Sequence, residues 1–357
     1  MASQSSRRAF FKTVGKGGLF AAAGASGFSS VAAAQGCGGL PFGLTREDLV
    51  HLYEGPWRGL RAVVEKKVID FHGHPFQPTK QALTERENEA ISARQELTDF
   101  TDDLIMSMDI HGIAKQCLMP PKLGWSVTYQ EVVEAASKHP DRFVLFCDPR
   151  TGDTRQERMA MPPGDRFGIE NPTAATEILR ARLRQGARAI GEITFTQTDY
   201  KKAFPIVELA MEFDVPVFFG VRAGRYAERS PRYVGEIAAQ YPQAKLVLGD
   251  AGGKNFMYGG GWEAVIILAT YGNVYLEIGA GPVELIDAAV QHAGADRILF
   301  GSDWGRPDPR NYLPPADRDA YLHWRNLNAV ALSNTSEAQK ELILYKNAAR
   351  LLKLGTA

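Results

Sequence analysis

The sequence predicts an α/β protein that folds as a single (β/α)8 TIM barrel. Two observations support this prediction: eight short and almost continuously apolar runs recur along the chain, and segments with helical periodicity separate them. Parallel strands that are covered on both faces have such apolar runs, and regular alternation of strands and helices is typical of a barrel. The chain of 357 residues has room for this fold, which typically occupies roughly 250 residues.

The strands and helices of the predicted barrel can be placed on the sequence. The strands are VIDFH (68–72), AKQCLM (114–119), FVLFCD (143–148), ARAIGEI (187–193), PVFFGV (216–221), KLVLGD (245–250), VYLEIG (274–279) and RILFGSD (297–303). Apolar residues at three- and four-residue steps predict helices over 97–112, 173–186, 204–213, 233–240, 283–294 and 335–353. Polar insertions over 75–96 and 149–172 follow the first and third strands, and we expect them at the carboxyl-terminal face, where loops build active sites.

Residues 1–34 differ in character from the rest of the chain. SRRAFFK (residues 6–12) holds two adjacent arginines, and a mildly apolar stretch without acidic residues runs from there to the alanines at 32–34. This order resembles a bacterial twin-arginine signal peptide, so we expect the twin-arginine machinery to export the precursor to the periplasm or the exterior. A disordered basic tail is the alternative. We expect residues 35–66 to form a helical lead-in that caps the bottom of the barrel, and residues 67–357 to form the barrel.

Charge and cysteine content narrow the class of protein. Removal of residues 1–34 leaves 37 basic and 41 acidic residues, a net charge of −4, whereas nucleic-acid-binding domains usually carry a strongly basic face. We therefore expect a small-molecule substrate and no nucleic-acid partner. The segment from Gly17 is too rich in Gly, Ser and Ala for stable membrane insertion. Cys117 and Cys147 lie inside apolar runs and are expected to be buried thiols.

Two histidines end the first predicted strand. His72 and His74 are separated by one residue in VIDFHGHPF, and alternation along a strand places both side chains on one face. Two neutral imidazoles at the mouth of a barrel form a compact chelate for a divalent metal, most often zinc. Histidines at strand ends can instead hydrogen-bond to loops, but the pairing of these two favours a metal site.

Further motifs occur at the predicted strands in a fixed order. After DFHGH come HPDRFVLFCDPR, FPIVELAMEFDVPV, YPQAKLVLGDAGG, DRILFGSDWG and NAARLL. From residue 67 to 353 the chain resembles the amidohydrolase superfamily, in its amidohydrolase 2 or metal-dependent hydrolase branch, which includes decarboxylases and lactonases. The resemblance implies that His72, His74 and Asp303 bind a metal and that Asp303 accepts a proton from the attacking water. Glu192 resembles a fourth-strand metal ligand, with a position in the barrel wall as the alternative.

The sequence departs from this family pattern at two strand ends. Gly220 and Asp250 stand where the family usually places histidines, at the ends of the fifth and sixth strands. A carboxylate at position 250 is a harder ligand than histidine, and it can also act as a general base. We therefore expect one divalent metal ion held by imidazoles and carboxylates, with zinc as the first choice and manganese or iron as alternatives.

Cationic residues follow several strands at the same face of the predicted barrel. Arg222 and Lys254 come after the fifth and sixth strands, and cationic side chains, guanidinium groups above all, bind carboxylates. These residues favour an anionic substrate, with a solvated and salt-bridged loop as the alternative. Trp304, after the eighth strand, is expected to wall an aromatic or sugar-like ring of the substrate.

Together these features predict a metal-dependent hydrolase that acts on an amide, ester or lactone of a small anionic molecule. The metal would polarise the substrate and lower the pKa of its water, Asp303 would remove the proton, and Asp250 would serve as a ligand or a second proton carrier. One alternative is metal-dependent decarboxylation of an aromatic or unsaturated acid. Another is a non-catalytic periplasmic binding or accessory protein with a degenerate site. A homo-oligomer is compatible with each of these functions.

Overall fold

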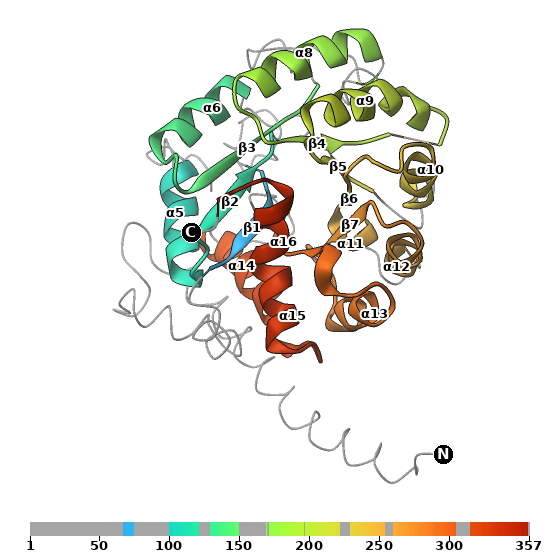
Figure 1. Cartoon of the computed structure of the whole chain (residues 1–357). Helices are drawn as coiled ribbons and strands as arrows, with labels where there is room; N and C mark the ends of the chain where they lie inside the picture. Colours follow the sequence, from blue (N-terminus) through green and yellow to red (C-terminus); the bar gives the residue numbers. More distant parts are fainter. Residues whose placement is uncertain are drawn as a thin grey trace, which may run out of the picture.

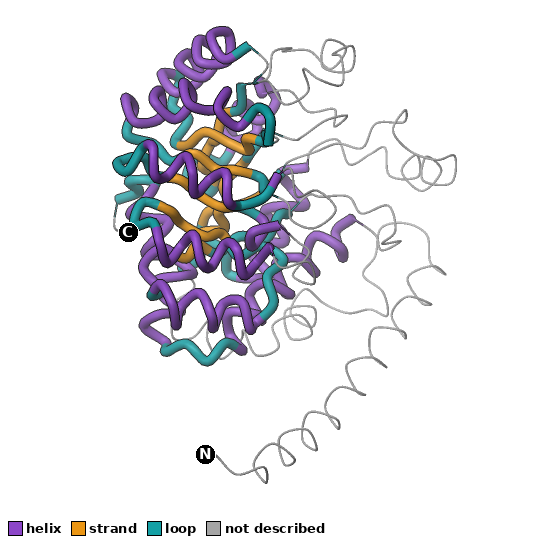
Figure 2. The backbone as a smooth tube through the Cα atoms, turned by 90° about the vertical axis from the view of Figure 1, so that its right-hand side faces the viewer, coloured by secondary structure: helices purple, strands orange, loops and turns teal. Residues whose placement is uncertain are grey.

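The computed structural model describes residues 67–74, 100–120, 129–149, 169, 171–195, 197–221, 229–253, 260–304 and 315–355. Their strands form an eight-stranded parallel sheet in the order β1-β2-β3-β4-β5-β6-β7-β8, and helices surround it (Figure 1). Figure 2 shows the same arrangement from the side, with the strands enclosed by helices. The predicted TIM barrel is therefore confirmed.

The strands follow the predicted apolar runs. They are β1 (Ile69–Gly73), β2 (Lys115–Leu118), β3 (Phe143–Cys147), β4 (Ala189–Ile193), β5 (Val217–Phe219), β6 (Leu246–Leu248), β7 (Val274–Glu277) and β8 (Ile298–Leu299). The helices are α5 (Phe100–His111), α6 (Tyr129–Lys138), α8 (Pro172–Arg184), α9 (Phe204–Phe213), α10 (Arg232–Gln240), α12 (Gly260–Thr270), α13 (Val283–Ala293), α14 (Pro315–Leu332), α15 (Glu337–Glu341) and α16 (Asn347–Leu351). Short helical turns are η3 (Tyr200–Ala203), α11 (Asp250–Gly253), η6 (Ala295–Arg297) and the π-helical η7 (Leu342–Lys346).

Three helices were not among the predicted segments, and one predicted helix is interrupted. The additional helices are α6, α12 and α14, and the segment predicted as one helix over 335–353 consists of α15, η7 and α16 in succession. Helix α8 begins as its sequence suggests, because the Asn171 side chain accepts a hydrogen bond from Ala174 N at 3.2 Å and a proline opens the helix. Gly186, just beyond its end, has φ of 109°, a conformation that glycine adopts readily.

Two buried clusters hold the layers together. Inside the barrel, inward-facing side chains pack against α16, and the cluster consists of Ile69, Phe71, Cys117, Met119, Val144, Phe146, Ala189, Phe218, Val247, Leu299, Ala348, Ala349, Leu351 and Leu352. A larger apolar cluster lies between the strands and the surrounding helices. Leu351 and Leu352 line a hollow together with Ala187 and Val215, which precede β4 and β5, so α16 closes the end at which the strands begin. Cys117 and Cys147 are buried free thiols, as predicted.

Backbone hydrogen bonds join the last strand to the first. Phe71 N donates to Phe300 O at 2.9 Å, and His74 N donates to Trp304 O at 2.8 Å. An isolated parallel bridge between Gly73 and Trp304 lies at the same seam. These bonds close the barrel at the ends of β1 and β8, where the candidate site residues lie.

Two strands have an irregular register, and each carries a site residue. The pairing register shifts within β1 and within β4. In β1, Phe71 packs inside the barrel, and the next residue, His72, also faces inward, with its ring 4.7 Å from that of Phe218. In β4, Ala189 faces inward, and so does Glu192 three residues later. A regular strand alternates its side chains, so both irregularities act as bulges that redirect a side chain into the barrel.

Several predictions concern parts of the chain outside the described residues. The predicted signal peptide and lead-in, residues 1–66, lie there, as do the insertion 75–96 and most of the insertion 149–172. None of the described helices is both long enough and apolar enough to cross a membrane.

Candidate metal centre

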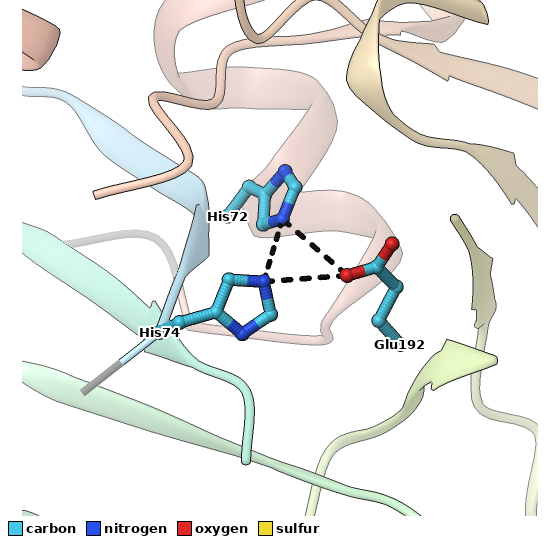
Figure 3. Close-up of side chains that lie close together, drawn as sticks. All are labelled: His72, His74 and Glu192. Atoms are coloured by element: carbon cyan, nitrogen blue, oxygen red, sulfur yellow. Dashed lines mark hydrogen bonds and ion pairs between the residues drawn. The ribbon is translucent and has the colours of Figure 1, made fainter. Parts of the chain in front are cut away.

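Two imidazole rings meet at the carboxyl-terminal mouth of the barrel. His72 and His74 come from the end of β1, and their Nε2 atoms lie 3.1 Å apart (Figure 3). His72 is fully buried, and His74 is 8% exposed. The two rings therefore converge, as their pairing in the sequence predicts.

Carboxylates from other strands surround these two nitrogens. Glu192, from β4, places Oε2 3.3 Å from His74 Nε2 and 4.0 Å from His72 Nε2 (Figure 3). Asp303, after β8, places Oδ1 3.3 Å from His72 Nε2 and 3.5 Å from His74 Nε2. Asp250, after β6, offers an oxygen within 4.8 Å of ligand atoms of His72 and Asp303. The structure thus brings together the five residues that the sequence predicts as metal ligands or proton carriers.

The spacing of the two imidazole nitrogens and the carboxylate oxygens beside them fits a divalent ion. Two donors that bind one tetrahedral ion at about 2.0–2.2 Å from it lie roughly 3.3 Å apart. The distances from the two Nε2 atoms to each other and to the Glu192 and Asp303 oxygens are 3.1–4.0 Å. Two facing imidazole nitrogens also require a proton or a cation between them, because their lone pairs repel. Nitrogen and carboxylate donors together are ligands for zinc and for manganese.

Burial and neighbouring charge set the protonation of the two histidines. Burial by itself lowers the pKa of His72, but the carboxylates of Asp303 and Glu277 outweigh this effect and raise the pKa to about 9. The pKa of His74 is lowered, chiefly by burial, and the neighbouring His72 adds to the lowering. In the metal-free protein the proton therefore resides on His72, and a bound cation would displace it.

Glu277, at the end of β7, is a site residue that the sequence analysis did not single out. Its Oε2 lies 3.2 Å from His72 Nδ1 and accepts a hydrogen bond from Asp250 N at 2.8 Å. A carboxylate bonded to Nδ1 orients the ring so that Nε2 faces the other donors. Burial raises the pKa of Glu277, and the neighbouring His72 partly offsets this effect. The lone acidic residue in the apolar run VYLEIG is the sequence signal that could have identified it.

Glycines make room for the two buried glutamates. A Cβ atom at Gly220 would fall on the carboxylate of Glu192, and a Cβ atom at Gly279 or Gly301 would fall on that of Glu277. The glycine that replaces the usual histidine at position 220 therefore has a structural role. It leaves the space that the Glu192 side chain fills from the neighbouring strand. Of the two orientations considered for Glu192, the structure has the one that faces the mouth.

Asp250 and Asp303 share a backbone conformation that L residues rarely adopt. Each has φ of 56°, in the left-handed region that Asp tolerates better than most residues. Asp303 N donates to His72 O at 2.9 Å, and Asp250 N donates to Glu277, so each turn is anchored to another site residue. Such conformations persist where the surrounding structure holds them, and they are concentrated at functional sites.

Of the predicted substrate-binding residues, the structure describes Trp304. Arg222 and Lys254 lie outside the described residues, so their roles stay predictions. Trp304 is 2% exposed and belongs to the apolar cluster between strands and helices, with its ring stacked on that of His323 at 6.5 Å. Packing against α14 therefore buries the indole, and the role of Trp304 as a wall for a substrate ring stays a prediction.

Comparison with known proteins places this arrangement in a family. A model of the amidohydrolase family matches residues 69–354, which include every strand of the barrel. The chain belongs to this amidohydrolase family. A comparison with curated proteins found no similar sequence.

Solved structures similar to this amidohydrolase share its fold at low sequence identity. A 2,6-dihydroxybenzoate decarboxylase from Rhizobium is 18% identical, with a TM-score of 0.52 and coverage of 81% of this chain and 98% of that one. A dihydroxybenzoic acid decarboxylase from Polaromonas sp. JS666, with bound manganese and 2-nitroresorcinol, is 18% identical, with a TM-score of 0.53 and coverage of 82% and 97%. An uncharacterized TIM-barrel protein from Bordetella bronchiseptica is 16% identical, with a TM-score of 0.57 and coverage of 80% and 98%.

Replacing Gly220 by alanine should weaken metal binding without unfolding the barrel. The added Cβ would occupy the position of the Glu192 carboxylate, so this ligand would be displaced. We expect the Kd for Mn²⁺ to rise at least about tenfold, as it does for other changes that disturb ligand placement. Isothermal titration calorimetry measures the Kd, and circular dichroism verifies the fold.

Gly272→Ala is the matched control for this substitution. A Cβ at Gly272 meets no atom within 4 Å, and its φ lies outside the left-handed region. We expect this variant to bind Mn²⁺ like the wild type. Equal affinities of the Gly220→Ala and Gly272→Ala variants would show that Glu192 is not a ligand.

The metal affinity of the protein should rise with pH up to about pH 9. His72 must lose its proton before Nε2 can bind a cation, and its pKa is raised to about 9. Since one proton is displaced per ion, we expect the apparent Kd for Mn²⁺ to fall about tenfold per pH unit between about pH 7 and about pH 9. Electron paramagnetic resonance of free Mn²⁺ measures this Kd, and a constant value over that range would contradict a charged His72.

Proposed function

We propose that this protein is a metal-dependent decarboxylase of a small aromatic or unsaturated carboxylic acid. The observation that carries metal dependence is the convergence of two imidazoles with the carboxylates of Glu192 and Asp303 at the barrel mouth. Decarboxylation is supported by the named activities of structures with the same fold. They include decarboxylases of dihydroxybenzoates and of 5-carboxyvanillate, two of them with bound manganese.

One divalent cation completes the site in this proposal. His72, His74, Glu192 and Asp303 would hold it, because the Glu192 and Asp303 oxygens each lie 3.3 Å from one of the two imidazole nitrogens. A donor set rich in carboxylates suits manganese as well as zinc. When bound, the cation supplies Lewis-acid polarisation of a substrate oxygen. Glu277 keeps the His72 ring in the orientation that directs Nε2 toward the other donors.

Asp303 and Asp250 are the proposed proton carriers. In decarboxylation the bond between the substrate carbon and its carboxyl carbon breaks, and carbon dioxide leaves. The electron pair stays on the substrate carbon, which then takes up a proton. The two aspartates lie together beside His72, so we assign delivery of this proton to Asp303 and its replacement to Asp250.

Hydrolysis of an amide, ester or lactone is the second candidate, and the description of the family as amidohydrolases favours it. The same residues would serve, because Asp303 would remove a proton from a water whose oxygen then bonds to the carbonyl carbon. In either reaction Arg222 and Lys254 are the proposed partners of a substrate carboxylate.

Product analysis distinguishes the two reactions. With Mn²⁺-loaded protein and a panel of hydroxylated benzoic acids, we expect release of carbon dioxide and, in D2O, one deuterium on the carbon that lost its carboxyl group. A parallel panel of esters and lactones in H2¹⁸O tests hydrolysis, in which the acid product gains one heavy oxygen. Heavy oxygen in product without any carbon dioxide release would refute decarboxylation.

Asp303→Asn should abolish turnover while leaving Mn²⁺ bound. The amide keeps the shape of the side chain and one ligand oxygen but cannot carry the transferred proton, so kcat should fall by about 10²–10⁴-fold. Asp296→Asn, at an exposed carboxylate before β8, is the matched control and should be fully active. Unchanged kcat in Asp303→Asn would remove this carboxylate from the mechanism. A wild-type protein that holds no metal would favour a binding or accessory protein instead.

A further inference from the structure

A buried polar cluster lies on the outer side of β1 and β8, behind the candidate metal centre. Its central residue is Asp70, whose carboxylate accepts hydrogen bonds from His72 N at 3.0 Å, from Ser302 N at 3.0 Å and from the Ser302 hydroxyl. A carboxylate has about four acceptor positions, and His323 Nε2, 3.1 Å away, occupies the remaining one. Asp70 and His323 are fully buried, so neither can touch a substrate.

His323, from α14, joins this carboxylate to three other elements. Its Nδ1 lies 2.7 Å from Ser107 Oγ of α5, and its Nε2 also lies 3.3 Å from Gln116 Oε1 of β2. Its ring stacks on the Trp304 indole, with 20° between the ring planes. Because both neighbours of Nε2 are acceptors, Nε2 carries the ring proton. The imidazole is therefore held at both nitrogens and at its face.

The contacts of His323 with Asp70 and with Trp304 connect it to the histidines of the metal centre. Through Asp70, His323 holds the backbone N–H of His72. Through Trp304, whose carbonyl accepts a hydrogen bond from His74 N at 2.8 Å, it holds the segment that carries the second histidine. One side chain on α14 thus supports the backbone at both imidazole ligands.

The same cluster supports Asp303 from both sides. Asp303 lies between Ser302 and Trp304 in the chain, and its φ of 56° is in the left-handed region. Ser302 is held by Asp70 through its backbone and its hydroxyl, and Trp304 packs on His323. The residues that flank Asp303 are therefore immobilised in the layer behind the site, which keeps its carboxylate at the mouth.

We infer that His323 is a positioning residue for the metal centre. By holding Asp70 and Trp304, it sets the spacing of His72, His74 and Asp303. This inference rests on the proposed metal-dependent function and extends it to a helix that contributes no ligand. The role requires a hydrogen-bond donor at Nε2 as well as a residue that fills the space between α14 and the strands.

Paired variants at position 323 separate positioning from packing. His323→Phe keeps an aromatic ring against Trp304 but removes the Nε2–H donor, whereas His323→Gln keeps an N–H donor for Asp70. Leu327→Ala, in the apolar cluster on the same helix, is the control for lost packing. For each full-length variant we measure Mn²⁺ affinity, the visible absorption of bound Co²⁺, which reports ligand geometry, and the Tm of the metal-free protein.

We expect His323→Phe to weaken Mn²⁺ binding about 10–100-fold and to shift the Co²⁺ bands, whereas His323→Gln stays within about threefold of the wild type. Leu327→Ala should lower the Tm and leave Mn²⁺ affinity and the Co²⁺ spectrum unchanged. If His323→Phe does not fold, Ser302→Ala decides. It removes the hydroxyl that donates to Asp70 and accepts from Trp304 N, so it should also weaken Mn²⁺ binding.

Three results would overturn the inference. Wild-type affinity and spectrum in His323→Phe, or in Ser302→Ala where that variant decides, would refute it and leave the proposed function intact. Equal losses in His323→Phe and His323→Gln would assign the effect to packing. A wild-type protein that binds neither Mn²⁺ nor Co²⁺ would refute the proposed function together with the inference.

Discussion

Compensation of buried negative charge at the barrel mouth is the constraint on which the rest of this structure depends. Glu192, Glu277 and Asp303 are almost fully buried around His72, and buried carboxylates are stable only when they are paired with positive charge or protonated. Burial lowers the pKa of His72, but the carboxylates of Asp303 and Glu277 raise it to about 9, so a proton on His72 provides part of this compensation in the metal-free chain. A bound divalent ion would compensate the negative charge with more positive charge than a proton does, and it would displace the proton of His72. Metal binding and the ionisation of these residues are therefore linked.

The backbone meets this constraint through local departures from regular geometry. The register shifts in β1 and β4 turn His72 and Glu192 into the barrel, and Gly220 leaves the space for the Glu192 carboxylate. Left-handed turns at Asp250 and Asp303 bring two further carboxylates to the same place. Each departure is unfavourable on its own, and the hydrogen bonds and packing around it hold it in place.

A barrel of this kind supports many reactions, so the chemistry must be argued from the site and not from the fold. The site of this amidohydrolase combines two imidazoles with a larger number of carboxylates, which suits a single divalent ion and transfer of protons. Support for these groups extends beyond the mouth. Asp70 and His323, on the outer side of β1, connect α14 to the strand ends that carry the ligands.

The sequence by itself determined the barrel and the pairing of His72 with His74, because both follow from apolar periodicity and from residues close together in the chain. It also pointed to Asp303 through a motif at the last strand. Only the tertiary structure decided that Glu192 faces the mouth, that Glu277 joins the site and that the Trp304 indole is buried. These outcomes depend on strand register, on space left by glycines of neighbouring strands and on packing against a distant helix. Such contacts join residues far apart in the chain, so no local pattern encodes them.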